Sequence, residues 1–321
     1  MWLTWVFLMV GFFTLYVGAE WLVKGASKLA VFLGLSPLLI GLTVVAFGTS
    51  APELLVSVVS AIKGKDMIAI GNVVGSNICN IALILGISSL LYPITCQKEV
   101  VKRDIPVMMG ISGFLILISL DSKISRLDGF VLFCALIAYI VFNYLQDKRR
   151  IVVQEEFLED SKTEEIRLAK NIFLLICGIA LVIFGAKIVV NSAEDIMRRF
   201  GISEKVIGLS IVAFGTSLPE LATSVVAAYK KHMDISIGNL IGSNAFNIMC
   251  VLGITALIRP IYISGGIFQS RLLMDYIIML FISIAPYLMA RHDFVINRRN
   301  GCILLVLYVA YVLYLYLFPT S

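Results

Sequence analysis

The chain has 321 residues, of which 60% are hydrophobic and only 15% are charged, and its formal net charge is +5. Soluble domains carry about 25% charged residues, and a soluble protein of this length could not bury so much apolar surface. No basic patch is interleaved with aromatic residues, so the positive charge does not indicate a nucleic-acid partner. The composition therefore predicts an all-α polytopic membrane protein whose main partner is the lipid bilayer.

The first apolar segment lacks the basic start and the small-residue cleavage site of a signal peptide, and we expect it to be the first helix of the mature protein. Further apolar runs follow along nearly the whole chain, each close to the roughly 20 residues that cross a bilayer. They predict about ten transmembrane helices. The expected spans are residues 3–33, 37–62, 68–92, 105–120, 127–145, 171–200, 205–229, 235–258, 272–290 and 302–318.

One hydrophilic stretch, Gln146 to Lys170, mixes charges of both signs and divides the chain. Five predicted spans lie before it, in residues 1–145, and five lie after it, in residues 171–321. We interpret residues 146–170 as a solvated cytosolic linker. Lys and Arg are more frequent in the loops on the same side as this linker, which favours both termini on the outer side of a cell (inner) membrane.

The two halves of the chain repeat each other. GLTVVAFGTSAPELLVSVV, which begins at Gly41, returns as GLSIVAFGTSLPELATSVV from Gly208, and the alignment continues without a gap. Because each half holds five predicted spans, an odd number, the second copy would enter the membrane from the opposite side. The sequence therefore predicts two inverted-topology five-helix repeats, an architecture found in many secondary transporters.

The repeated GTS-x-PE motif places polar residues in the middle of a predicted span. Pro52 has no N–H, so the carbonyl of Gly48 loses its helical partner and neighbouring carbonyls can tilt off the helix axis. Such carbonyls are tolerated in lipid only where they line a cavity or bind something. Thr49 and Ser50 lie four and three residues before Glu53 and therefore share its face of the helix. The equivalent side chains are those of Thr216, Ser217 and Glu220, and the loosened carbonyls would include those of Ala46, Thr49, Ala213 and Thr216.

A second repeated motif, GN-xx-GSN-xx-N, spaces polar residues by four and so places them on one helix face. The glycines within it would let helices approach closely. The first asparagine of each copy has helix capping as an alternative role, and we rank it below the last asparagine as a ligand. The polar sets are Asn72, Ser76 and Asn80 in the first copy and Asn239, Ser243 and Asn247 in the second, and the glycines are Gly71, Gly75, Gly238 and Gly242.

Together the two motifs offer oxygen ligands almost exclusively. Hard cations prefer such ligands, and calcium takes about six to eight of them. Two ionised glutamates would neutralise one divalent cation, and each buried carboxylate costs at least ~2.5–3.5 kcal/mol at the bilayer centre.

The six cysteines are scattered without a CxxC pair and are interpreted as buried apolar residues, and the two histidines fall in predicted loops. No zinc or copper site is therefore expected.

The paired motifs resemble the two alpha repeats of sodium/calcium exchangers in the calcium/cation antiporter superfamily. The residues that carry the resemblance are GTSAPE with GNVVGSNICNI and GTSLPE with GNLIGSNAFNI, and it extends over nearly the full chain. It implies a diamond-like cluster of four cation sites between the repeats. The implied central calcium site uses Glu53, Glu220, Thr49, Thr216, Asn80 and Asn247. The implied flanking sodium sites use Ala46, Ser50 and Ser76 on one side and Ala213, Ser217 and Ser243 on the other.

The resemblance also implies an activity. It predicts a secondary antiporter, not an enzyme, that exchanges sodium for calcium by alternating access and needs no cofactor, with the first and sixth helices sliding past a fixed core. Members of this family often carry an aspartate at the position of Asn247, whereas both copies have asparagine here. Two central carboxylates instead of three argue against potassium co-transport.

The residues leave other functions open. A calcium/proton exchanger of the same fold is the nearest alternative because glutamates can take protons, although proton coupling would not require the serine hydroxyls of the two motifs. A cation channel belongs to another class, and channels usually repeat around a pore made by several subunits. An intramembrane hydrolase would need a Ser–Lys or Ser–His pair or two aspartates, whereas the intramembrane serines here have Asn and Glu neighbours.

Overall fold

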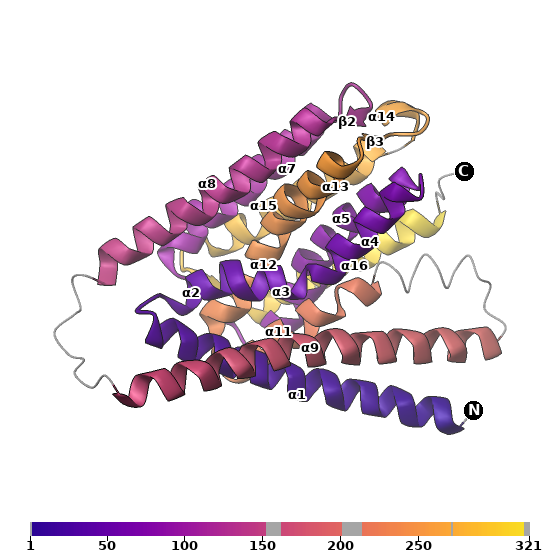
Figure 1. Ribbon diagram of the computed structural model, residues 1–321. Helices are drawn as coiled ribbons and strands as arrows, with labels where there is room; N and C mark the ends of the chain where they lie inside the picture. The colour runs from indigo at the N-terminus through magenta and orange to yellow at the C-terminus, as the bar shows by residue number, and fades with distance from the viewer. Residues whose placement is uncertain (1, 152–161, 201–213, 271, 318–321) are drawn as a thin grey trace.

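The computed structural model describes residues 2–151, 162–200, 214–270 and 272–317. These ranges fold almost entirely into helices that pack in one bundle (Figure 1). Among them, seven helices are long and apolar enough to cross a membrane, and one bent helix pair would form an eighth span. The prediction of an all-α multi-pass membrane protein is confirmed, and the loops within the same ranges add four strands of two residues each.

The first half of the chain contains one long helix followed by several helices that are interrupted within the bundle. Segments labelled η are π-helical turns, which are wider than the α-helix and occur often at functional sites. The elements are α1 (Trp2–Phe32), α2 (Pro37–Ile40), η1 (Gly41–Val45), α3 (Ala46–Thr49), α4 (Ala51–Ile62), α5 (Asp66–Ile78), η2 (Cys79–Leu85), α6 (Gly86–Leu91), η3 (Val100–Asp104), α7 (Ile105–Ile118) and α8 (Arg126–Ile151).

The second half repeats this order, because α9 corresponds to α1, α11 to α4, and α12–η4–α13 to α5–η2–α6. Helices α15 and α16 correspond to α7 and α8. The elements are α9 (Lys162–Arg199), α11 (Leu218–Tyr229), α12 (Met233–Phe246), η4 (Asn247–Leu252), α13 (Gly253–Ile258), α14 (Gly266–Gln269), α15 (Leu272–Ala290) and α16 (Arg298–Leu317). Residues 205–213 of the seventh predicted span lie outside the described residues.

The ends of helices differ from the predicted spans where charged residues follow apolar ones. Helix α8 continues to Ile151 and α9 begins at Lys162, so both extend into the predicted linker. Lys, Arg, Glu and Gln are good helix formers, and hydropathy therefore does not mark these ends. In contrast, α15 coincides with the predicted span 272–290.

Two small antiparallel sheets join loops of the first half to loops of the second. Strand β1 (Ile94–Thr95) pairs with β4 (Val295–Ile296), and β2 (Lys123–Ile124) pairs with β3 (Ile261–Tyr262). Since β1 precedes α7 and β2 follows it, the two sheets lie at opposite ends of that helix. They tie the halves together on both sides of the bundle.

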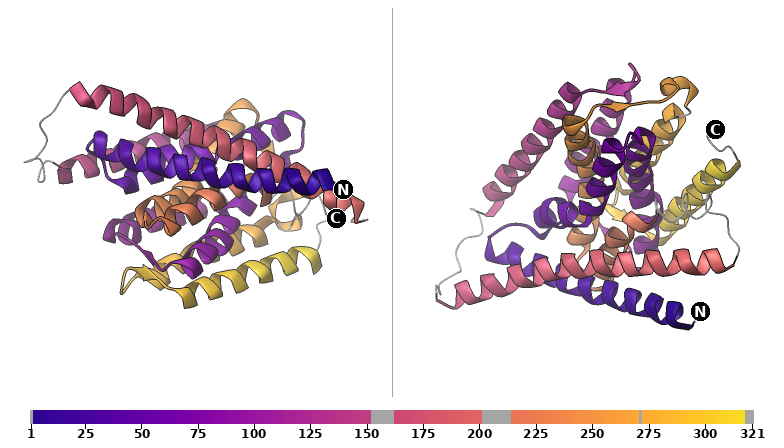
Figure 2. Two further views of the ribbon diagram at one scale, coloured as in Figure 1. Left: turned by 90° about the horizontal axis from the view of Figure 1, so that it is seen from below. Right: turned by 45° about the vertical axis from the view of Figure 1, so that its right-hand side comes forward.

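Helices α1 and α9 lie side by side along one flank of the bundle (Figures 1 and 2). A Cβ atom added to Gly11 would lie 2.8 Å from Cγ2 of Val189, and one added to Gly25 would lie 2.7 Å from the backbone nitrogen of Leu175. The early part of α1 thus faces the late part of α9, and the two helices are antiparallel. Glycine is required at these crossings because any larger side chain would push the helices apart.

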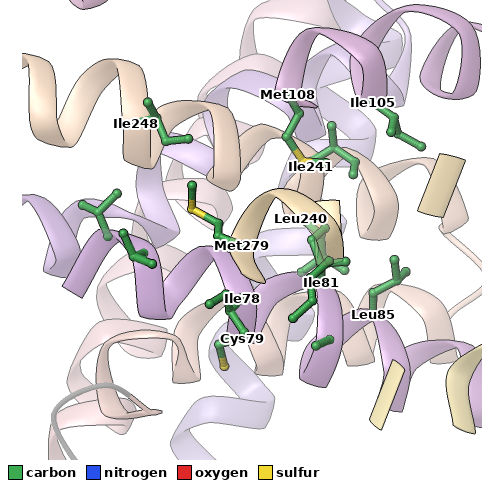
Figure 3. Packing of buried hydrophobic residues seen from close by; sticks show 14 of the residues in the cluster. Ile78, Cys79, Ile81, Leu85, Ile105, Met108, Leu240, Ile241, Ile248 and Met279 are labelled. Atoms are coloured by element: carbon green, nitrogen blue, oxygen red, sulfur yellow. The ribbon is translucent and has the colours of Figure 1, made fainter. Parts of the chain in front are cut away.

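The main apolar core lies in the other helices and contains no described residue of α1 or α9. Figure 3 shows part of it, including Ile78, Ile81, Leu240, Ile248 and Met279. All five side chains are completely buried. In lipid this core gains its stability from close packing rather than from removal of apolar surface from water.

The outer surface of the bundle is apolar, with large exposed hydrophobic side chains on α1, α8 and α16. Cys79, Cys96 and Cys250 are buried, as predicted for the cysteines, and Cys177 is partly buried, but Cys134 and Cys302 are exposed on α8 and α16. The prediction is wrong for these two residues because a helix surface that faces lipid accepts small apolar side chains as readily as the interior does.

Candidate functional site

The GTS-x-PE motif breaks its helix at the serine. Helix α3 ends before Ser50 and α4 begins after it, and the two helical segments are bent by 44°. Pro52 occupies the first turn of α4, where a missing N–H leaves no helical hydrogen bond unmade. Ser217 has nearly the same backbone conformation, with φ of −87° and ψ of 3° against −82° and 5° for Ser50, and Pro219 follows it in the first turn of α11. The same motif therefore specifies the same break in both halves.

The break brings the two glutamates into the interior. Glu53 and Glu220 are completely buried in the first turns of α4 and α11. Ser50 Oγ donates a hydrogen bond of 3.1 Å to Oε1 of Glu220, and Ser76 Oγ donates one of 3.5 Å to Oε1 of Glu53. The bond from Ser50 crosses between the halves, so the two copies of the motif meet at one place.

The threonines of the first motif contact the asparagines of the second. Thr49 Oγ1 donates to Asn239 Oδ1 at 3.1 Å and lies 3.5 Å from Ser243 Oγ, and Thr216 Oγ1 donates to Asn72 Oδ1 at 3.3 Å. Both asparagines lie well inside α5 and α12, whose N-cap positions are held by other residues. Helix capping is therefore excluded for Asn72 and Asn239.

The last asparagine of each second motif lies in a π-helical turn. Asn80 follows Cys79 at the start of η2, and Asn247 opens η4. Each donates its Nδ2 group across the interface between the halves, Asn80 to Oδ1 of Asn244 at 3.0 Å and Asn247 to Oδ1 of Asn77 at 3.1 Å. Their own Oδ1 oxygens are left without a donor from the described part of the chain.

Several buried oxygens of the two motifs accept no hydrogen bond from the described residues. Buried polar groups in proteins are normally hydrogen-bonded, so a set of buried acceptors without donors calls for a partner that the chain does not supply, and water or a cation can provide it. Among the described residues no three His, Cys, Asp or Glu side chains converge, so neutral oxygens would have to supply most of the ligands. Such a set fits a hard cation. The buried oxygens that accept no hydrogen bond from described residues include Glu53 Oε2, Glu220 Oε2, Asn80 Oδ1, Asn247 Oδ1 and Ser217 Oγ.

The structure thus places the predicted side chains of both motifs around one interior region. The carbonyl of Ala46 lies 3.3 Å from Thr49 Oγ1 and accepts a helical hydrogen bond from the N–H of Ser50 at 2.9 Å, so it is not freed from its helical partner as predicted. Ala213, its predicted counterpart, lies outside the described residues. Of the motif glycines, Gly242 packs against Leu42, as expected, and Gly71 and Gly75 have no described residue within 4 Å of an added Cβ.

Sequence reasoning missed four polar residues that support the site. Ser57 and Ser224 accept hydrogen bonds from the amides of Asn72 at 3.0 Å and Asn239 at 2.9 Å. Each serine lies four residues after the glutamate of its copy, on the same helix face, and this repeated spacing was the available signal. The other two are the middle asparagines of the second motif, Asn77 and Asn244, which are also repeated in register.

The chain is similar to known cation exchangers over its whole length. Residues 3–145 and 170–317 match the model of the family described as sodium/calcium exchanger protein. The putative antiporter CaxA of Alkalimonas amylolytica is 37% identical, with 95% of this chain and 96% of that protein covered. The sodium/calcium exchanger MaX1 of Methanosarcina acetivorans is 32% identical, with 96% and 97% covered. A solved structure of the sodium-calcium exchanger NCX_Mj superimposes with a TM-score of 0.84 at 32% identity, over 97% of this chain and 98% of that one.

Proposed function

The chain belongs to the sodium/calcium exchanger family, and we propose on that premise that it exchanges sodium for calcium across the membrane by alternating access. Members of this family are cation antiporters, so the protein is a transporter and not an enzyme, and sodium and calcium are its substrates rather than cofactors. The observation that carries the proposal is the set of buried oxygens without hydrogen-bond donors, on two glutamates and two asparagines at the meeting point of the repeated motifs.

The central site holds calcium. Glu53 and Glu220 together match the charge of one divalent cation, and the repulsion between them is relieved when that cation lies between their Oε2 oxygens. Asn80 and Asn247 contribute neutral oxygens, and Thr49 and Thr216 contribute backbone carbonyls, as calcium requires more oxygen ligands than two carboxylates supply.

The flanking sites hold sodium. A serine hydroxyl that donates its hydrogen to a glutamate, as Ser50 and Ser76 do, keeps its lone pairs for a cation. Because these serines share the glutamates with the central site, sodium and calcium compete for one charge, and only one kind of ion occupies the site at a time. The two proposed sets are Ala46, Ser50 and Ser76, and Ala213, Ser217 and Ser243.

The membrane arrangement comprises ten spans in two inverted five-helix repeats, residues 1–145 and 171–321, joined by a cytosolic linker over 146–170. The antiparallel packing of α1 and α9, which hold equivalent positions in the two repeats, supports the inversion. Their absence from the main core cluster, as far as the described residues show, supports sliding of this pair past the other helices.

Both termini face the outside of the cell (inner) membrane in this arrangement. Helix α1 begins and α16 ends on the same side of the bundle, whereas α8 ends and α9 begins on the opposite side (Figure 1). The higher frequency of Lys and Arg in the loops on the linker side supports a cytosolic location for that side.

The proposal is tested by calcium uptake into proteoliposomes that contain the purified full chain. An outward sodium gradient should drive uptake, and potassium should not be required, because the centre has two carboxylates rather than three. Uptake driven by a proton gradient without sodium would instead establish the calcium/proton exchanger. Unitary currents in planar bilayers would establish a channel.

A further inference from the structure

We propose that Asn77 and Asn244 are positioning residues that set the amide orientation of Asn80 and Asn247 and thereby select a neutral side chain at these two ligand positions. The proposal rests on the cation site proposed above. It concerns residues that are not themselves among the proposed ligands, and it assigns them a role in the specificity of that site.

The contacts of the four asparagines form a crossed pattern with two equivalent halves. Asn77 Nδ2 donates to the backbone oxygen of Asn244 at 3.3 Å, and Asn244 Nδ2 donates to the backbone oxygen of Asn77 at 3.2 Å. The Oδ1 atoms of the same two residues accept from the other repeat, Asn244 from Asn80 at 3.0 Å and Asn77 from Asn247 at 3.1 Å. All four residues are at most 1% exposed.

The orientation of each amide in this pattern follows from chemistry. A backbone carbonyl can only accept a hydrogen bond, so the side-chain atom of Asn77 that faces Asn244 O must be the nitrogen. The oxygen of Asn77 must then face Asn247, and only the nitrogen of Asn247 can donate to it. The mirror-image argument runs from Asn244 to Asn80.

These hydrogen bonds determine which amide atom of Asn80 and Asn247 is available to a cation. Since the Nδ2 groups of Asn80 and Asn247 are held by Asn244 and Asn77, their Oδ1 oxygens do not face these two acceptors and stay without a donor among the described residues. A free amide could present either its nitrogen or its oxygen to the site, and only the oxygen binds a cation. Asn77 and Asn244 remove that freedom before the ion arrives, which is preorganisation of the site.

The hydrogen bonds of Asn77 and Asn244 also disfavour a third carboxylate at position 80 or 247. An ionised aspartate in place of Asn80 or Asn247 would set a carboxylate oxygen against the Oδ1 oxygen of Asn244 or Asn77, with no hydrogen between them. Reversal of the Asn244 or Asn77 amide would not help, because it would set an oxygen against a backbone carbonyl of the other repeat. The network thus favours two charges in the centre, the number that one divalent cation neutralises.

A double-mutant cycle on calcium binding tests the inference. Binding of 45Ca2+ is measured with the purified full chain in detergent, without any gradient, so that the result does not depend on the coupling ion. Asn244→Ala should weaken binding about tenfold, because the Asn80 amide loses its acceptor. In the Asn80→Ala background the same change should add less than about twofold, because there is no amide left to orient. Asn77→Ala with Asn247→Ala forms the mirrored cycle.

A control variant and an isosteric variant separate positioning from general damage. Asn143→Ala removes another buried asparagine, 1% exposed and bonded to the Tyr139 carbonyl at 2.9 Å, and should bind calcium like the unmodified chain. Asn244→Asp keeps the side-chain volume and an accepting oxygen, but it replaces the Nδ2 donor by an oxygen that faces the Asn77 backbone carbonyl, so it should weaken calcium binding at least as much as Asn244→Ala. It also serves as the deciding variant if the alanine variants do not fold.

The outcomes are distinct. Independent, multiplicative losses for Asn244→Ala and Asn80→Ala would reduce Asn244 to a packing residue and overturn the positioning role, while the exchanger function would stand. Calcium binding by Asn244→Asp within about twofold of the unmodified chain would do the same. An unmodified chain that binds no calcium would overturn both the site and this inference, and proton-driven uptake with the expected cycle would overturn sodium coupling alone.

Discussion

At the scale of single residues, the two buried glutamates dominate the energetics of the site. Each carboxylate is completely buried and has one oxygen that accepts no hydrogen bond from the described residues. Burial of an unpaired charge destabilises a protein strongly, and here two such charges lie in one interior region, because Ser50, three residues before Glu53, donates a hydrogen bond to Glu220. A bound divalent cation compensates both at once, so these residues should matter more for ion binding than for folding.

Neutralising either glutamate should abolish calcium exchange without loss of folding. Glu53→Gln and Glu220→Gln keep the side-chain volume but remove the charge, and sodium-driven 45Ca2+ uptake should fall by about 100-fold or more. Thermal unfolding in calcium-free detergent should occur at the same or a higher temperature, because the repulsion is gone. A folded variant that transports at a near-normal rate would contradict the assignment of the central site.

The serines beside the glutamates should affect sodium more than calcium. Ser50→Ala and Ser217→Ala each remove one hydroxyl of the proposed flanking sites, and the sodium concentration for half-maximal exchange should rise about threefold to tenfold. Calcium binding should change by less than about twofold. Ser112→Ala, which removes a buried hydroxyl bonded to the Met108 carbonyl at 2.9 Å on α7, is the matched control. Equal losses for both ions would argue against separate sodium sites.

At the scale of helices, the contact between α1 and α9 depends on glycine. An added Cβ at Gly18 would lie 2.7 Å from the backbone nitrogen of Val182, and one at Gly178 would collide with the backbone of Leu22. Backbone atoms cannot move aside as side chains do, so the interaxial distance is set by these residues. The pair can therefore move as one body, which is what sliding past the core requires.

Gly18→Ala should separate the two long helices. We expect the free energy of unfolding to fall by about 1–3 kcal/mol, despite the gain of up to about 1 kcal/mol that alanine brings to a helix interior. Gly110→Ala in α7, where an added Cβ meets no described residue within 4 Å, should be neutral or stabilising. Denaturant unfolding in detergent measures both. Similar free energies of unfolding for the two variants would show that the interface between α1 and α9 accommodates an added methyl group.

At the scale of the whole molecule, one ion pair joins the two repeats asymmetrically. Lys230 Nζ lies 2.7 Å from Oε1 of Glu20 and joins the end of α11 to α1. The equivalent residues of the other repeat are Lys63 and Lys187, which carry like charges. If alternating access exchanges the roles of the repeats, the state opposite to this structure loses an attraction and gains a repulsion.

Lys187→Glu should shift the conformational equilibrium toward that opposite state. Exposed ion pairs contribute about 0.2–1 kcal/mol, so the population ratio should change by about fivefold at most, and less at high salt. Glu20→Gln should shift it in the same direction. The shift can be followed by the rate at which cysteines introduced near each membrane surface react with a thiol reagent. Unchanged rates on both sides in both variants would show that the ion pair does not bias the transport cycle.

The sequence by itself determined the class of protein and predicted the polar residues that the structure brings together. Lipid selects long apolar segments, and a proline or a buried carboxylate in such a segment is costly enough to mark a functional position. The break at Ser50, the burial of Glu53 and Glu220, and the shared faces around them therefore follow from local spacing. The repeat supplied a second, independent copy of each signal.

Only the tertiary structure decided which polar groups meet across the two halves. Asn77 and Asn244 are 167 residues apart in the chain, and the amide of Asn80 finds its acceptor 164 residues away. Helical spacing says which residues share a face but not what that face contacts, so it could not distinguish these asparagines from packing or capping residues. The orientation of an amide is set by its partners, and here the partners become neighbours only when the two repeats pack together.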